Sequence, residues 1–416
     1  MGVGPPSSLA AVGDAPGLRS ARYERQRARI VEAAVLLVNE KGVCAMTLQE
    51  VAQALDLTTT SVTYYYRYKE QLTAAVFEDT LGRLHDMVRE AAGAATPQER
   101  VARYVEIYFD QFARGLRGKA PPLAVLSELR TLEDGARRPL LAKYQAIFRD
   151  VRRLFGEVDT AERKRLFSAR AQLLNEALFW TIIWLPNYPL SDFHNVRRRM
   201  MDIFENGIAS APSSWTGSIV DPDAGALEDA KQDFLRVAAR LINDIGYKGA
   251  SVERIVSELK ITRGSFYHHL EAKDDLILEC YRHDYRRMTR IQQEVDRSER
   301  NALFRLAGSI MSVLTLQFEG SHPLLRTTAL HAMPVGLRQQ AIERFDRLAR
   351  WLAGVLVDGM GDGSVRIVDP MIAANIIIST INSAYDLRGW ARRQPREDAI
   401  DTYAAVLMTG LFDRPC

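Results

Sequence analysis

The chain has 416 residues, 47% hydrophobic and 26% charged, an ordinary composition for a folded protein of roughly two to four domains. Its formal net charge of +3 gives no argument for nucleic-acid binding from bulk charge alone. Cys44, Cys280 and Cys416 are too few for a disulfide framework and fit a reducing compartment. The amino terminus lacks the pattern of a secretory signal, and the longest apolar runs are too short to span ~30 Å of bilayer. We therefore expect a cytoplasmic protein without a membrane partner.

The first 72 residues read as an arm followed by three helices. Residues 1–22 are expected to form a flexible basic arm, and residues 23–72 the first helical unit. Apolar residues at i, i+3, i+4, i+7 and i+8 predict the inner face of one helix: Ile30, Ala33, Ala34, Leu37 and Val38. Gly42 is placed to end that helix with a positive φ, and Thr47 and Glu50 predict a capping box on the second helix. Thr58 is placed to cap the third helix.

The same pattern returns 204 residues later without a gap. The repeated helix face comprises Phe234, Val237, Ala238, Leu241 and Ile242. The glycine, the two capping positions and the lysine that opens the fourth helix recur as Gly246, Ser251, Thr262 and Lys273. Three helices in one register predict two copies of one fold with diverged surfaces.

The repeat divides the chain and sets its fold class. We expect an all-α protein, because each three-helix unit is followed by a long, mostly helical pattern with few alternating runs. The predicted parts after the first unit are a helical regulatory domain (73–209), a linker (210–225), a second helix-turn-helix unit (226–276) and a second regulatory domain (277–416). The linker SAPSSWTGSIVDPDAG is rich in Ser, Pro, Gly and Asp.

Two short helices joined by a tight turn make a helix-turn-helix, whose last helix presents its first residues to a DNA major groove. The run TTTSVTYYYRYKEQL (58–72) supplies hydroxyls for phosphate oxygens and methyl groups for thymine. The alternative is a solvent-facing, tyrosine-rich surface of a helix bundle. The candidate DNA-binding residues are Arg25, Arg27, Thr47, Thr58, Thr59, Thr60, Thr63, Tyr64, Tyr65 and Lys69 in the first copy, and Ser251, Thr262, Arg263, Gly264, Ser265, Tyr267, His268, His269 and Lys273 in the second.

Both copies resemble the tetracycline-repressor (TetR) family of transcriptional regulators over residues 25–76 and 229–281. The family has a sequence block with Tyr, His, Leu, Lys and Leu at fixed spacing, and the second copy carries this block at residues 267–276. In the first copy, Thr63 stands at the position of the block's first tyrosine. The resemblance implies an all-α protein with a three-helix DNA-binding head and a larger domain for dimerisation and ligand binding. It implies a ligand-responsive repressor, a double-stranded DNA operator and a small apolar or aromatic effector, with no cofactor.

Two copies in one chain suggest a single-chain pseudo-dimer, with a further homodimer as an open alternative. The apolar helices around 166–184 and 371–385 are expected to form its internal seam with residues 193–208 and 399–412; each pair could instead be core of its own copy. Because the heads differ in sequence, we expect an imperfectly palindromic operator, with Arg263 favouring guanine. The acidic residues before the second head suggest that it binds DNA weakly or has a mainly structural role.

Aromatic pairs one helical turn apart suggest the wall of an effector pocket in the first regulatory domain, although ordinary core is the simpler reading. The candidates are Tyr108, Phe112, Tyr144, Phe148, Phe179 and Trp180.

Enzymatic readings find little support. The glycine-rich segment 359–363 follows a helix pattern and predicts a turn, and Cys280 and His283 lack the further ligands of a zinc site. We therefore expect no catalytic residue and no metal. The competing function is a helical small-molecule- or partner-binding protein in which one or both heads are degenerate.

Overall fold

The computed structural model describes residues 16–211, 215, 217–224, 230–264, 273–298, 301–319, 323–326 and 335–412. The first copy contains α1 (Pro16–Ala45), α2 (Leu48–Gln53), α3 (Thr59–Tyr65), α4 (Lys69–Ala91), α5 (Pro97–Leu116), α6 (Asp134–Arg153), α7 (Ala161–Trp184) and α8 (Phe193–Asn206). Short 3-10 turns, η1 (Leu126–Thr131), η2 (Leu185–Asn187) and η3 (Leu190–Asp192), connect its later helices.

The second copy contains α9 (Ala230–Gly249), α10 (Val252–Leu259), α12 (Lys273–Ser298), α13 (Ala302–Glu319), α14 (Val335–Asp362), α15 (Pro370–Ser383), η5 (Ala384–Leu387), α16 (Arg388–Ala391) and α17 (Arg396–Thr409). Within the described ranges the fold is all-α, with one isolated bridge between Ala209 and Val365. None of these helices combines the length and apolarity needed to cross a bilayer.

The second helix of each head begins at the predicted capping residue, Thr47 or Ser251. Thr47 Oγ1 accepts the Glu50 amide at 3.2 Å, and the Glu50 carboxylate accepts the Thr47 amide at 2.9 Å, which completes the capping box. Ser251 caps α10 without a box. Gly42 (φ 80°) and Gly246 (φ 74°) both adopt the positive φ expected of them, which lets the first helix of each head turn sharply toward the next.

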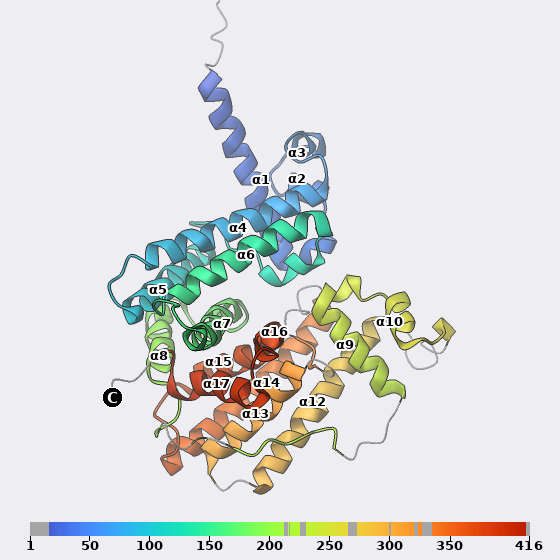
Figure 1. Ribbon diagram of the computed structural model, residues 1–416. Coiled ribbons are helices and arrows are strands. Elements are labelled where there is room, and N and C mark those ends of the chain that lie inside the picture. The colour runs from blue at the N-terminus through green and yellow to red at the C-terminus, as the bar shows by residue number, and fades with distance from the viewer. Residues whose placement is uncertain are drawn as a thin grey trace, which may run out of the picture.

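The amino-terminal arm differs from the prediction. Helix α1 already begins at Pro16, so residues 16–22 are helical and the predicted boundary at 22/23 lies inside one helix. The segment SARYERQRAR is rich in alanine, arginine, glutamate and glutamine, which favour a helix over a flexible arm. Its arginines therefore lie on a helix that projects beyond the first head (Figure 1).

The predicted linker lies against the second copy. The Val220 amide donates to Ser312 Oγ at 2.8 Å, and Arg290 Nη1 donates to the Pro222 carbonyl at 3.2 Å. A Cβ atom on Gly217 would lie 2.3 Å from the Gly308 backbone, so this close approach to α13 needs glycine. Residues 217–224 are thus packed on α12 and α13.

The two copies join through their last helices. Helix α7 packs against α15 and α17 in the centre of the molecule, and α8 packs against α15 at one side (Figure 1). Trp180 Nε1 donates to Asn375 Oδ1 at 3.2 Å across this boundary, and Trp390 Nε1 donates to the Arg165 carbonyl at 3.2 Å. The four helices that the sequence singled out therefore contact one another between the copies.

The ends of α8 and α17 cross at a pair of glycines. Gly207 has φ 66° and Gly410 has φ 99°, and a Cβ atom on either would lie within 3 Å of the opposite chain segment. The Leu411 amide donates to the Phe204 carbonyl at 2.6 Å, and the amides of Ile208 and Ala209 both donate to the Met408 carbonyl at 3.0 Å. Equivalent positions of the two copies thus meet at one point.

Candidate nucleic-acid interface and effector cavity

Helix α3 of the first head presents one polar face. Val62 is fully buried beneath it, whereas Thr59, Thr60 and Tyr64 are exposed and Thr63 is half-buried. Thr58 Oγ1 accepts the Ser61 amide at 3.2 Å and so begins the helix at the predicted residue. Tyr64 leaves 74% of its surface exposed, which is unusual for a large aromatic side chain.

The helical extension of α1 supports this face. The Tyr23 ring lies 4.8 Å from the Tyr65 ring and 6.2 Å from the Tyr64 ring, measured between centroids. These aromatic contacts fix the arginine-bearing part of α1 next to α3. Arg25 is exposed there, and its Nε donates to the Ala21 carbonyl at 3.2 Å.

Two predicted DNA-binding cations make contacts inside the head. Arg27 Nε donates to the Tyr66 hydroxyl at 3.1 Å, and burial raises the pKa of that hydroxyl above its ordinary value, so it remains neutral. The Lys69 ammonium donates to the Cys44 carbonyl at 2.8 Å, close to the end of α1. Both side chains therefore already help to hold α1, α3 and α4 together.

The second head presents different chemistry. Thr262, Arg263 and Gly264 are exposed after α10. The Arg263 guanidinium forms an ion pair with the Glu253 carboxylate of α10. Lys273 begins α12 as predicted. Four further candidates, Ser265, Tyr267, His268 and His269, lie outside the described residues.

A cavity of about 600 Å³ lies in the first copy, in the size range of small-molecule sites. All six aromatic residues selected from the sequence line it: Tyr108, Phe112, Tyr144, Phe148, Phe179 and Trp180. The Tyr108 and Phe179 rings lie 6.4 Å apart, and burial raises the pKa of the Tyr108 hydroxyl well above its ordinary value. The cavity thus has a mostly apolar, aromatic wall.

An asparagine links the first head to this wall. Asn39 of α1 donates from Nδ2 to the Leu123 carbonyl at 2.8 Å and accepts the Val125 amide at 2.9 Å. Thr80 of α4 accepts the intervening Ala124 amide at 2.9 Å. Asn39, Thr80 and residues 122–127 all line the cavity.

The second copy repeats this clamp, with the clamping side chains shifted by 204 positions and the clamped segment by 201. Asn243 of α9 donates to the Leu324 carbonyl at 2.9 Å and accepts the Arg326 amide at 3.0 Å. Asp284 of α12 takes the place of Thr80 and accepts the Leu325 amide at 2.6 Å. This pair was not predicted, although Asn39 and Asn243 align in the repeat and place one polar residue at the same position of both inner helix faces.

Cys280 and the glycine-rich segment 359–363, which the sequence offered as possible metal-binding or nucleotide-binding motifs, lie in α12 and at the end of α14. Among the described residues, no group of three or more histidine, cysteine, aspartate or glutamate side chains is arranged to hold a metal ion. The Cys280 thiol donates to the Leu235 carbonyl at 3.5 Å, and burial raises its pKa. The glycine-rich segment forms the end of α14, and Gly363 follows it with φ 78°.

Comparison with known proteins matches the two heads. The sequence model of the family described as "Bacterial regulatory proteins, tetR family" matches residues 30–76 and 234–280. The chain is similar to the HTH-type transcriptional regulator BetI of Rhizobium meliloti, with 35% identity over 91 residues, 21% of this chain and 45% of that protein. It is also similar to the HTH-type transcriptional repressor AcnR of Corynebacterium diphtheriae, with 34% identity over 64 residues, 15% of this chain and 34% of that protein. The chain therefore spans less than half the length of these relatives.

Solved structures give similar matches at lower identity. A TetR-family transcriptional regulator from Bordetella parapertussis has 19% identity and a TM-score of 0.37, covering 44% of this chain and 94% of the other. The TetR-family regulator PfmR from Thermus thermophilus has 24% identity and a TM-score of 0.35, covering 42% and 96%.

Proposed function

Because this chain is a TetR-family protein that carries the family's DNA-binding region twice, we propose that it is a sequence-specific DNA-binding transcriptional regulator. It acts as a repressor that a small molecule releases from DNA. The observation that carries the proposal is the polar face of α3, where Thr59, Thr60, Thr63 and Tyr64 point outward beside the arginine-bearing extension of α1. This face offers hydroxyls to phosphates and methyl groups to thymines.

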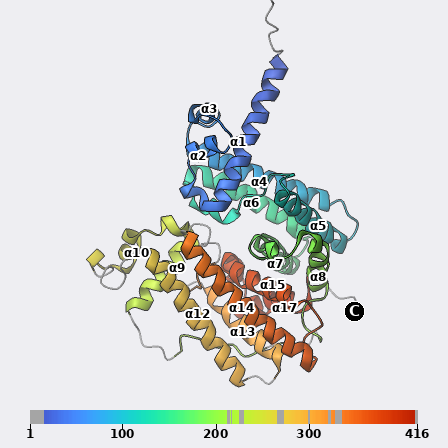
Figure 2. The same cartoon turned by 180° about the vertical axis from the view of Figure 1, so that it is seen from behind.

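The chain forms its own pair of heads. The packing of α7 and α8 on α15 and α17 supports this proposal, since it joins the two copies through corresponding helices. Figure 1 places the first head at the top and the second head at the right, and Figure 2 places them at the top and the left, so they do not lie at opposite ends. Two such heads read half-sites about one helical turn apart, or a multiple of it.

The two heads contribute unequally. Thr59 and Thr60 of the first head are exposed, whereas Arg263 of the second is held by Glu253. To reach guanine, Arg263 must leave that carboxylate, which reduces the affinity gained at the second half-site. The operator is therefore an imperfect palindrome whose first half-site dominates.

Binding to duplexes selected from a random pool tests this function. Tyr64→Phe removes one exposed hydroxyl and keeps the ring that packs on Tyr23, so we expect about threefold to tenfold weaker binding of the selected duplex. Tyr285→Phe is the matched control, because Tyr285 is also exposed but lies on α12 outside the heads. Equal affinity of the unaltered chain for selected and scrambled duplexes would refute the proposal.

A further inference from the structure

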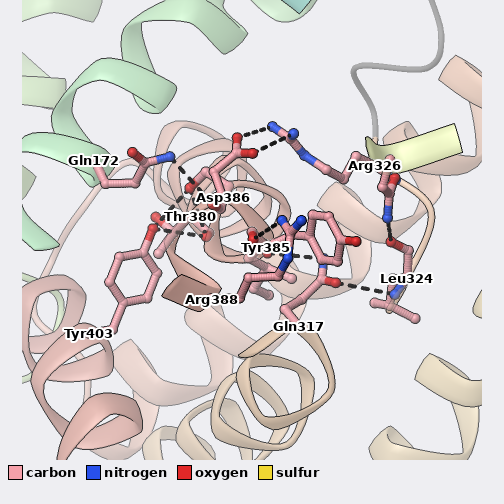
Figure 3. Close-up of polar contacts among 12 residues, drawn as sticks. Gln172, Gln317, Leu324, Arg326, Thr380, Tyr385, Asp386, Arg388 and Tyr403 are labelled. Carbon is pink, nitrogen blue, oxygen red and sulfur yellow. Dashed lines mark hydrogen bonds and ion pairs between the residues drawn. The ribbon is translucent and has the colours of Figure 1, made fainter. Parts of the chain in front are cut away.

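The cavity of the first copy is completed by the second copy. Arg326, Ser379, Asn382 and Asp386 line it together with the aromatic residues of α5, α6 and α7. Arg326 is 2% exposed, and its guanidinium grips the Asp386 carboxylate through two contacts of 2.9 and 2.6 Å (Figure 3). The Asp386 side chain is 23% exposed and is the more accessible member of this pair. The second copy thus contributes the Arg326–Asp386 ion pair to the cavity wall.

This ion pair is bonded to the second head. The backbone amide of Arg326 donates to Asn243 Oδ1 at 3.0 Å, and Asn243 lies on α9, the first helix of that head. The next residue of α9, Asp244, accepts the Tyr385 hydroxyl at 2.9 Å and Arg388 Nη2 at 2.7 Å. Tyr385 and Arg388 flank Asp386 in η5 and α16 (Figure 3). A shift of Asp386 therefore acts on α9 through two sets of hydrogen bonds.

The first head reaches the same cavity directly. Leu36 and Asn39 of α1 line it, and Asn39 holds the segment Leu123–Val125 that forms part of its wall. One cavity is thus in contact with the first helix of one head. It reaches the first helix of the other head through Arg326 and through η1, which lines the cavity and packs on α9.

The charges of the lining indicate the kind of molecule that fits. Among the described residues, the charged side chains that line the cavity are those of Glu176, Arg326 and Asp386, which together carry a formal charge of −1. The aromatic rings around them present electron-rich faces, which attract cations. A cationic end therefore meets a more favourable potential in this cavity than an anionic end.

We propose that this composite cavity is a single effector site that serves both heads and takes an aromatic or apolar molecule with a cationic end, which lies against Asp386. The effector role rests on the proposed function, whereas binding and its effect on the two heads do not require DNA. A bound cation contacts the Asp386 carboxylate together with Arg326 and so changes the hydrogen bonds that hold α9. The apolar body of the molecule contacts Asn39 and the segment Leu123–Val125.

The test uses the full chain, freed of nucleic acid, with ethidium as the cationic probe and anilinonaphthalene sulfonate as the anionic one. We expect one ethidium per chain, bound more tightly than the anion, with quenching of Trp180 fluorescence that Trp180→Phe removes. Asp386→Asn should weaken ethidium binding about tenfold. Asp202→Asn is the matched control, because Asp202 pairs with Arg366 between the copies at 2.9 Å but does not line the cavity.

Amide hydrogen exchange then reports on the heads. Saturating ethidium should change exchange in both α1 and α9 of the unaltered chain, and Asp386→Asn should reduce the change in α9 while that in α1 persists. Asn382→Phe, which fills the cavity and keeps the ion pair, should prevent binding and both changes. Circular dichroism of each variant must match that of the unaltered chain. If Asp386→Asn fails this control, Asn382→Phe still tests the inference.

Three results would overturn the inference: no saturable ethidium binding, tighter binding of the anionic probe, or an exchange change in α9 that Asp386→Asn leaves intact. If the chain binds ethidium as expected but selects no DNA sequence, the proposed function is refuted and the proposal of a shared binding cavity is retained. If the chain selects a DNA sequence but does not bind ethidium, the shared cavity is refuted and the proposed function is retained.

Discussion

The asparagine clamps allow a comparison inside one molecule. Asn243→Ala removes two hydrogen bonds, of 2.9 and 3.0 Å, to the buried segment 323–326, and Asn243 itself is 3% exposed. Water cannot replace these bonds, so the Leu324 carbonyl and the Arg326 amide each lose a partner at about 1–3 kcal/mol. We expect a local cost of about 2–6 kcal/mol for the two groups together. Asn39→Ala removes equivalent bonds at a half-buried position that water can reach, at about 1–2 kcal/mol.

Amide hydrogen exchange measures both costs locally, without requiring that the whole chain unfold in one step. At tenfold per 1.4 kcal/mol, the Arg326 amide should exchange at least about 25-fold faster in Asn243→Ala, and the Val125 amide about 5- to 30-fold faster in Asn39→Ala. Asn39→Asp is the control, because it keeps the acceptor for the Val125 amide and loses only the donor. An Arg326 amide that stays protected in Asn243→Ala would refute the reasoning.

Three further predictions concern the backbone, the pH response and the second head. Gly42→Ala should destabilise the first head by about 1–3 kcal/mol, because its φ of 80° and ψ of 160° suit only glycine. The control is Gly135→Ala in α6, where a Cβ atom meets open space, and this variant should keep the melting temperature of the unaltered chain. Burial raises the pKa of Asp284 from its usual 3.8 to about 7, although the neighbouring Arg287 acts in the opposite direction. Because the folded chain holds this proton more tightly than the unfolded chain, the free energy of unfolding falls as pH rises from about 4 to about 7. Asp284→Asn should therefore gain melting temperature relative to the unaltered chain over that range, by the equivalent of up to about 4 kcal/mol; a difference that shrinks as pH rises contradicts this. Glu253→Gln releases Arg263 and should tighten binding of the selected duplex severalfold, an effect that Arg263→Ala should cancel.

Local chemistry made much of the fold predictable. Caps and glycines act through residues next to them in sequence, so Thr47, Thr58, Gly42 and Gly246 could be assigned without knowledge of the tertiary structure. The aromatic pairs of α5 and α6 likewise follow from helical spacing, and the structure brings them to one cavity.

Long-range contacts could not be predicted in the same way. Nothing in the sequence near Arg326 or Asp386 indicates that they lie across a copy boundary from Phe148 and Trp180, because that depends on how α7 and α15 pack. The helical extension of α1 was missed for a different reason. Its many arginines suggested a solvated arm, although arginine is also a good helix former.

Selection of binding sites from a random duplex pool by the full chain tests the central claim most directly. The account predicts enrichment of two unlike half-sites whose centres lie ~34–36 Å apart or at a multiple of this, bound by one chain. No enrichment, a single isolated half-site, or a perfect palindrome that requires two chains would contradict it.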